Sequence, residues 1–127
     1  MRVRVGTAAL VSLLVAFGSA ASAVAAGDAA RGKAVFRRCT VCHSLAAGEN
    51  GIGPSLHGLF GSKAGTAPGF SFSRAMRSSG IVWDEAALRK FLADPPAAVP
   101  GTRMASGAVD NPQALDDLLA YLKAAGR

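Results

Sequence analysis

Apolar side chains recur at helical spacing in four segments of this chain, and each segment follows a residue that can cap a helix. The predicted helices run from residue 29 to near residue 39, from 74 to 77, from 85 to 93, and from 112 to a stop at Gly126. The last one has the strongest signals. Asn111-Pro112 combines a capping side chain with a proline at the first helical position, and four leucines between positions 115 and 122 then form one apolar stripe.

The segments between these helices read as loops. Residues 46–69 are rich in glycine and contain two prolines, and residues 93–110 contain three more prolines. We find neither a strand pattern nor an internal repeat. Irregular segments of this length are unusual in a compact domain unless they wrap around a bound group. The sequence therefore predicts an all-α domain of about four helices, with long loops closed over a cofactor.

The first 26 residues are typical of a secretory signal peptide. Arg2 and Arg4 precede an uncharged apolar stretch, and small residues then continue to Ala26. Cleavage after Ala25 or Ala26 fits this pattern and leaves residues 27–127 as the mature domain. The alternative is a retained anchor, because residues 5–26 could just span a bilayer. We expect cleavage, a periplasmic location and no stable membrane insertion afterwards.

Composition narrows the class of protein. A chain of 127 residues suits one domain, and its two cysteines exclude a disulfide-rich scaffold. Aromatic residues make up only 6% of the chain, which favours a bound cofactor as part of the core. The formal net charge of +6 is lowered by two on signal cleavage. Export and the lack of interleaved aromatic and basic residues argue against nucleic acid, so acidic protein surfaces are the expected partners, unless the charge serves only solubility.

One motif indicates the chemistry of a bound cofactor. Residues 39–43, Cys39-Thr40-Val41-Cys42-His43, form a C-x-x-C-H haem-attachment motif. Two thiols three residues apart on one helical turn can each add to a vinyl group of the same haem. His43 then reaches one face of the iron. A disulfide redox pair would require a βαβ context, and a zinc site would require further ligands beyond His57, the only other histidine. The motif predicts one covalent haem c.

With this motif in place, the whole mature chain resembles the class I cytochromes c, in particular the bacterial c2 and mitochondrial group. The matching segments agree in order and separation: Gly27-Asp28 with Gly32 and Phe36, residues 39–43, 53–61, 67–70 and 80–83, Pro100-Gly101-Thr102-Arg103-Met104, and residues 118–122 with Tyr121. The resemblance implies that Gly32, Phe36 and Tyr121 join the first and last helices.

The resemblance also assigns roles around the haem. Met104 corresponds to the second axial ligand. The only other methionine of the mature chain is Met76, which lies on a short predicted helix where an apolar core residue is expected. Pro54 corresponds to the residue whose backbone carbonyl accepts a hydrogen bond from the His43 ring N–H. A proline has this backbone acceptor but no backbone N–H donor. Trp83 corresponds to an indole that donates to a haem propionate, with a plain core aromatic as the alternative. Phe91 is expected in the haem pocket.

Several positions depart from the family pattern. Phe91 and Phe72 stand where tyrosines are common, Met76 where asparagine is common, and Ser62 where arginine is common. These four changes remove polar groups from the haem surroundings. Ser106 replaces a phenylalanine that usually follows the methionine ligand by two residues. The departures bear on the potential and the propionate contacts but touch neither attachment nor axial ligation.

The resemblance implies a soluble periplasmic one-electron carrier, not an enzyme, that shuttles between respiratory or photosynthetic complexes. Its expected partners are acidic surfaces of a bc1-type complex, a terminal oxidase or a reaction centre, met by a monomer. Arg38 and Arg103 directly precede Cys39 and Met104, so we expect them, with Lys33 and Lys63, to form the docking face. The alternatives are a dedicated cytochrome subunit of a periplasmic dehydrogenase, and a haem sensor with a weak or absent sixth ligand.

Overall fold

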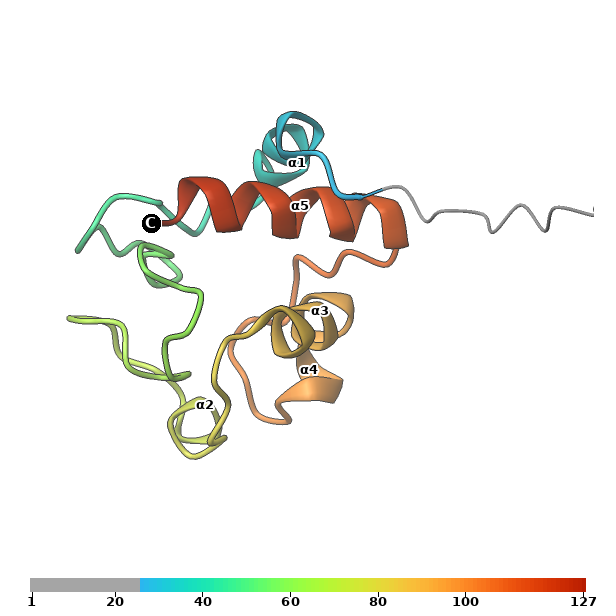
Figure 1. The fold of residues 1–127 in the computed structure, drawn as a ribbon. Coiled ribbons are helices and arrows are strands. Elements are labelled where there is room, and N and C mark those ends of the chain that lie inside the picture. Colours follow the sequence, from blue (N-terminus) through green and yellow to red (C-terminus); the bar gives the residue numbers. More distant parts are fainter. Residues whose placement is uncertain (1–25) are drawn as a thin grey trace, which may run out of the picture.

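The computed structural model describes residues 26–127, so the predicted signal segment, apart from Ala26, lies outside the described residues. Within that range the chain forms helices and two isolated bridges but no strand. The helices are α1 (Ala29–Phe36), α2 (Arg74–Arg77), α3 (Glu85–Ala93), α4 (Pro95–Ala98) and α5 (Pro112–Ala125) (Figure 1). The prediction of an all-α domain with long loops is confirmed. No helix in this part of the chain is long and apolar enough to cross a membrane.

The residues predicted to cap the four helices all act as N-caps in the structure. In each case a side-chain oxygen accepts the backbone N–H of the residue three positions later, at 2.7–3.1 Å. The capping residues are Asp28, Ser73, Asp84 and Asn111. The helix α5 has its proline at the first position and ends just before Gly126, as its sequence predicts.

Two boundaries differ from the sequence-based expectation. Residues 95–98, expected as loop, form α4, and the Asp94 side chain accepts the Ala97 N–H at 3.2 Å. Prolines fit there because the first N–H groups of a helix have no partner within the helix. The helix expected to reach residue 39 ends at Phe36, where the Cys39 N–H bonds to the Phe36 carbonyl at 2.8 Å. This shorter i to i+3 bond tightens the chain into the turn that carries the cysteines.

The helix α1 crosses α5 at close range (Figure 1). A Cβ built on Gly32 would lie 1.9 Å from the Asp117 carbonyl oxygen, so only glycine permits this approach. The rings of Phe36 and Tyr121 pack against each other across the same contact, with centroids 5.4 Å apart and planes tilted by 49°. Buried Asp117 accepts hydrogen bonds from Arg31 Nε at 2.9 Å and from the Asp28 backbone N–H at 2.8 Å. The predicted contact of the first and last helices is confirmed, with an ion pair added to it.

The apolar core lies between α5 and α3 and continues into a cavity. Buried leucines of both helices, Leu88, Leu92, Leu118 and Leu122, belong to the core and also line that cavity. The long loops 37–73 and 99–110 supply most of its remaining walls. The helices thus form one wall of the cavity, and the loops carry Cys39, Cys42, His43 and Met104.

Candidate functional site

A cavity of about 580 Å³ occupies the centre of the domain. This volume is typical of a site that encloses a small molecule or cofactor. Most of the lining side chains are apolar, and they come from α1, α2, α3, α5 and the two long loops. The residues that the sequence assigns to attachment, ligation and the haem pocket all line this cavity. They are Cys39, Cys42, His43, Pro54, Trp83, Phe91 and Met104.

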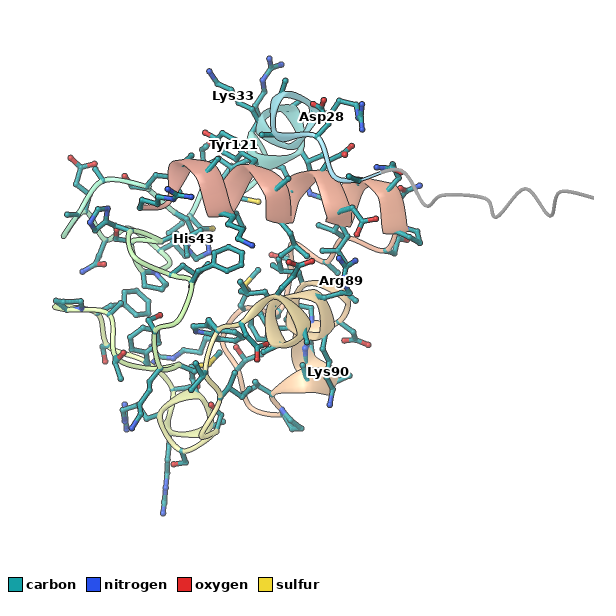
Figure 2. The ribbon with its side chains drawn as sticks, viewed as in Figure 1. Asp28, Lys33, His43, Arg89, Lys90 and Tyr121 are labelled. Atoms are coloured by element: carbon teal, nitrogen blue, oxygen red, sulfur yellow. The ribbon has the colours of Figure 1, made fainter. Side chains whose placement is uncertain are left out.

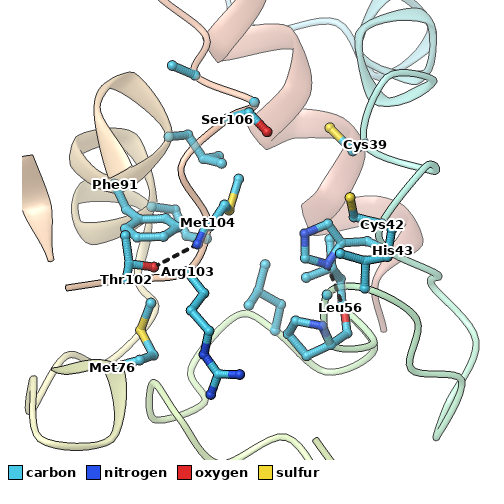
Figure 3. A pocket seen from close by; sticks show the side chains of 18 of the residues that line it. Cys39, Cys42, His43, Leu56, Met76, Phe91, Thr102, Arg103, Met104 and Ser106 are labelled. Carbon is cyan, nitrogen blue, oxygen red and sulfur yellow. Dashed lines mark hydrogen bonds between the residues drawn. The ribbon is translucent and has the colours of Figure 1, made fainter. Parts of the chain in front are cut away.

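The cysteines and His43 share one turn of chain. The N–H groups of Cys42 and His43 both bond to the Cys39 carbonyl, at 3.1 and 2.9 Å. This folding brings both free thiols and the imidazole to one wall of the cavity (Figure 3). Burial raises the pKa of the Cys39 thiol, so this group is poorly suited to be the thiolate of a redox pair.

The imidazole of His43 is held in one orientation. Its Nδ1–H donates to the Pro54 carbonyl at 2.8 Å, as the sequence predicts (Figure 3). A Cβ built on Gly53 would lie only 2.4 Å from the ring carbon Cε1, so this buried glycine leaves the space that the ring fills. With Nδ1 engaged, Nε2 is the nitrogen left for a metal. The role of Gly53 was not assigned from sequence.

Met104 lies across the cavity from His43 (Figure 3). Its backbone N–H donates to Thr102 Oγ1 at 3.2 Å, which fixes the start of the turn. Gly107, with a φ of +95°, approaches the methyl end of the side chain, and a Cβ there would lie 3.3 Å from Cε. The sequence assigned no role to Thr102 or Gly107, because their contacts depend on the path of the loop.

Three apolar side chains form the wall behind Met104. Trp83 and Phe91 are 7% and 6% exposed and pack with ring centroids 5.1 Å apart. Met76 is buried on α2 and lines the same cavity (Figure 3). These residues make this side of the site largely apolar.

The four residues expected at a docking face separate into two pairs. Arg38 and Arg103 are exposed and line the cavity. Lys33 and Lys63 are exposed but do not line it. Figure 2 shows Lys33 on the outer side of α1, beyond α5 from His43. The structure therefore brings only the two arginines to the cavity.

The side chains that could ligate a metal distinguish a zinc ion from a haem as the bound group. Nowhere in residues 26–127 do three His, Cys, Asp or Glu side chains gather as they would around a metal ion, so a zinc site has no ligand set here. Two thiols beside a fixed imidazole, a thioether on the opposite wall and an apolar cavity between them fit a covalently attached haem.

The family model for cytochrome c matches residues 29–126. The chain belongs to the cytochrome c family. Cytochrome c2 from Rhodomicrobium vannielii is 48% identical over 80% of this cytochrome and 82% of its own length. Cytochrome c2 from Blastochloris viridis is 44% identical over 90% and 91% of the two chains. The solved structure of cytochrome cH from Methylobacterium extorquens matches with a TM-score of 0.73 and 46% identity, covering 77% of this cytochrome and 99% of that chain.

Membership of the family identifies the cofactor. A cytochrome c binds one haem c through thioether bonds, and Cys39 and Cys42 of this cytochrome fit the attachment motif. The family match also confirms the resemblance that the sequence indicates.

Proposed function

We propose that this cytochrome is a periplasmic one-electron carrier whose haem iron is ligated by His43 and Met104. The observation that carries the proposal is the placement of the imidazole and the thioether on opposite walls of one apolar cavity, with both thiols beside the imidazole (Figure 3). Residues 27–127 form the exported domain in this proposal, and residues 1–26 are its signal peptide.

Side chains and one backbone carbonyl of this protein would hold the haem and set its reduction potential. Cys39 and Cys42 would hold the haem c, which when bound supplies an iron that gains and loses one electron. The Pro54 carbonyl keeps the His43 ring in place and increases its basicity as a ligand. A thioether ligand and an apolar wall of Phe91 and Met76 both favour the less charged ferrous state, which raises the potential. We assign the indole N–H of Trp83 to a haem propionate.

The ligand set favours a carrier over an enzyme or a gas sensor. If His43 and Met104 both ligate, the protein leaves no coordination position open for a substrate or a gas. The protein's task is then to set the potential and to present the haem edge to its partners.

The proposed partners are acidic surfaces of membrane redox complexes, such as a bc1-type complex, a terminal oxidase or a reaction centre. Arg38 and Arg103 place two positive charges at the cavity, beside Val41 and Ile52, which are 75% and 78% exposed. Val82 is the one further exposed large apolar side chain found in residues 26–127. Such a small apolar area suits a transient complex of a monomer better than a permanent subunit of a dehydrogenase.

Electron transfer from a reduced acidic partner to the ferric protein tests this function. We expect a reversible one-electron redox titration, and a second-order transfer rate that falls steeply as salt is raised, since screening weakens charge steering. A rate that is independent of both protein concentration and salt would favour the permanently bound subunit.

A further inference from the structure

The loop that carries Met104 is buried only at its two ends. Val99 and Val109, each 3% exposed, anchor its two ends, and the Val109 N–H donates to the Leu92 carbonyl at 2.8 Å. Between these anchors, every residue from 100 to 108 is exposed or only half-buried. Buried side chains of the loop itself therefore hold only its two ends, and hydrogen bonds from other segments are needed to position the residues between them.

Two arginines provide the restraint. The Arg38 guanidinium, which lies next to Cys39, donates to the Ala108 carbonyl, and the Arg103 guanidinium donates to the Ser71 carbonyl at 2.8 Å. These bonds join residues 70 and 32 positions apart. Every other hydrogen bond found for residues 100–108 stays within the loop or reaches only its anchor Val99. The two arginine bonds are thus the only ones that fasten this loop to distant parts of the described chain.

The two bonds lie on either side of Met104. One connects the end of the loop to the wall that carries the cysteines, and the other connects its start to the loop before α2. Neither guanidinium is engaged by a carboxylate, because the arginine ion pairs found in residues 26–127 involve only Arg31 and Arg89. A guanidinium has five N–H donors, so each arginine can hold a carbonyl and still face a partner.

We propose that Arg38 and Arg103 are positioning residues that keep the Met104 thioether facing His43. The inference rests on the proposed ligation by these two residues. Each arginine lowers the population of the open loop, in which the sulfur has left its place. The same side chains are the proposed docking charges, so an acidic partner that drew the guanidinium groups away from the carbonyls would also loosen the methionine.

The test is the apparent affinity of the ferric, haem-loaded protein for imidazole, which binds the iron only after Met104 leaves. The loss of one charge-assisted hydrogen bond at the surface should raise this affinity about fivefold in Arg38→Ala and again in Arg103→Ala. Arg37→Ala is the matched control: Arg37 is exposed, adjacent in sequence and equally charged, but it does not line the cavity. We expect less than a twofold change there.

Amide hydrogen exchange of residues 101–108 provides a second measurement, which is read from the loop itself and not from the iron. Exchange should accelerate about fivefold in Arg38→Ala and stay unchanged in Arg37→Ala. Equal imidazole affinities and equal loop exchange in the Arg37, Arg38 and Arg103 variants would overturn the positioning role. If the wild-type ferric protein lacked a sulfur-to-iron band, the ligand assignment would fail instead, and loop exchange would still decide on the arginines.

Discussion

The His43 ring fills the space that a side chain at Gly53 would need. A Cβ at position 53 would lie 2.4 Å from ring atom Cε1 and 2.7 Å from Nδ1, the atom bonded to the Pro54 carbonyl. The ring cannot retreat without losing that hydrogen bond or leaving its place as a ligand. Gly53 is thus required by packing, not by backbone conformation, since it has no positive φ.

Gly53→Ala should therefore disturb the ligand and not merely the fold. We expect a loss of about 1–3 kcal/mol in the free energy of unfolding from overpacking, together with a changed ferric spectrum. Gly58→Ala is the control, because that position has a φ of +66° but nothing within 4 Å of a built Cβ. It should cost stability through backbone strain while the spectrum stays as in the wild type. An unchanged spectrum in Gly53→Ala would show that the ring has room to move.

Acid stability should depend on the contact of α1 and α5. The hydrogen bond from Arg31, helped by the Asp28 backbone N–H, lowers the pKa of Asp117 from 3.8 to about 2. A carboxyl whose pKa is depressed by folding stabilises the fold above its unfolded pKa, and this contribution is lost as pH falls toward 2. Denaturant midpoints measured from about pH 5 to about pH 2 should therefore fall more steeply in the wild type than in Asp117→Asn.

The control for this experiment is Asp110→Asn. Asp110 is exposed and forms none of the ion pairs found in residues 26–127. That variant should follow the wild-type pH profile. Parallel profiles for Asp117→Asn and the wild type would show that the ion pair adds no acid-sensitive stability.

Local sequence signals predicted where α1, α2, α3 and α5 begin, but they missed α4 and placed the end of α1 too far along the chain. The caps Asp28, Ser73, Asp84 and Asn111 act within three residues, and all were readable from sequence. Asp94-Pro95 has the same pattern of a capping residue followed by proline as Asn111-Pro112, but residues 93–110 were predicted as loop because they contain three prolines.

The site was predictable where motif and resemblance fixed a position. Cys39, Cys42, His43 and Met104 indeed line one cavity, and the His43 to Pro54 bond was expected from the resemblance. The contacts that sequence reasoning missed join distant residues, such as Arg38 with Ala108 and Arg31 with Asp117, which are 70 and 86 positions apart. Their pairing follows from the path of the whole chain, which no local pattern encodes.

Met104→Ala should keep its haem and lose its sulfur ligand. The thioether bonds of Cys39 and Cys42 do not depend on the methionine, whereas the low-spin spectrum does. We expect the ferric sulfur-to-iron band to vanish and the potential to fall markedly. Met76→Leu, a change of similar volume at the buried α2 position, is the control and should retain the band. Loss of the band in Met76→Leu, together with its retention in Met104→Ala, would show that Met76 and not Met104 is the sulfur ligand.

Methionine ligation should persist to high pH. Residues 94–103 contain no lysine that could replace the sulfur, and the guanidinium of Arg103 stays protonated. Lys63 and Lys90 are exposed and do not line the cavity, and buried Pro95 in α4 restricts the loop's movement. In a pH titration the ferric band should therefore outlast pH ~9 and disappear only with hydroxide binding or unfolding. Its loss near pH ~9 with nitrogen ligation would contradict this expectation, since a free lysine titrates around 10.4.

The visible spectrum of the purified protein, recorded oxidised and reduced and then again after extraction with acidified organic solvent, tests the central claim most directly. The account predicts a low-spin haem c spectrum in both states, with a sulfur-to-iron band in the ferric form, and haem that stays on the denatured polypeptide because Cys39 and Cys42 hold it. Haem that passes into the organic phase, or a high-spin ferric spectrum without the sulfur band, would contradict covalent attachment or ligation by Met104, respectively.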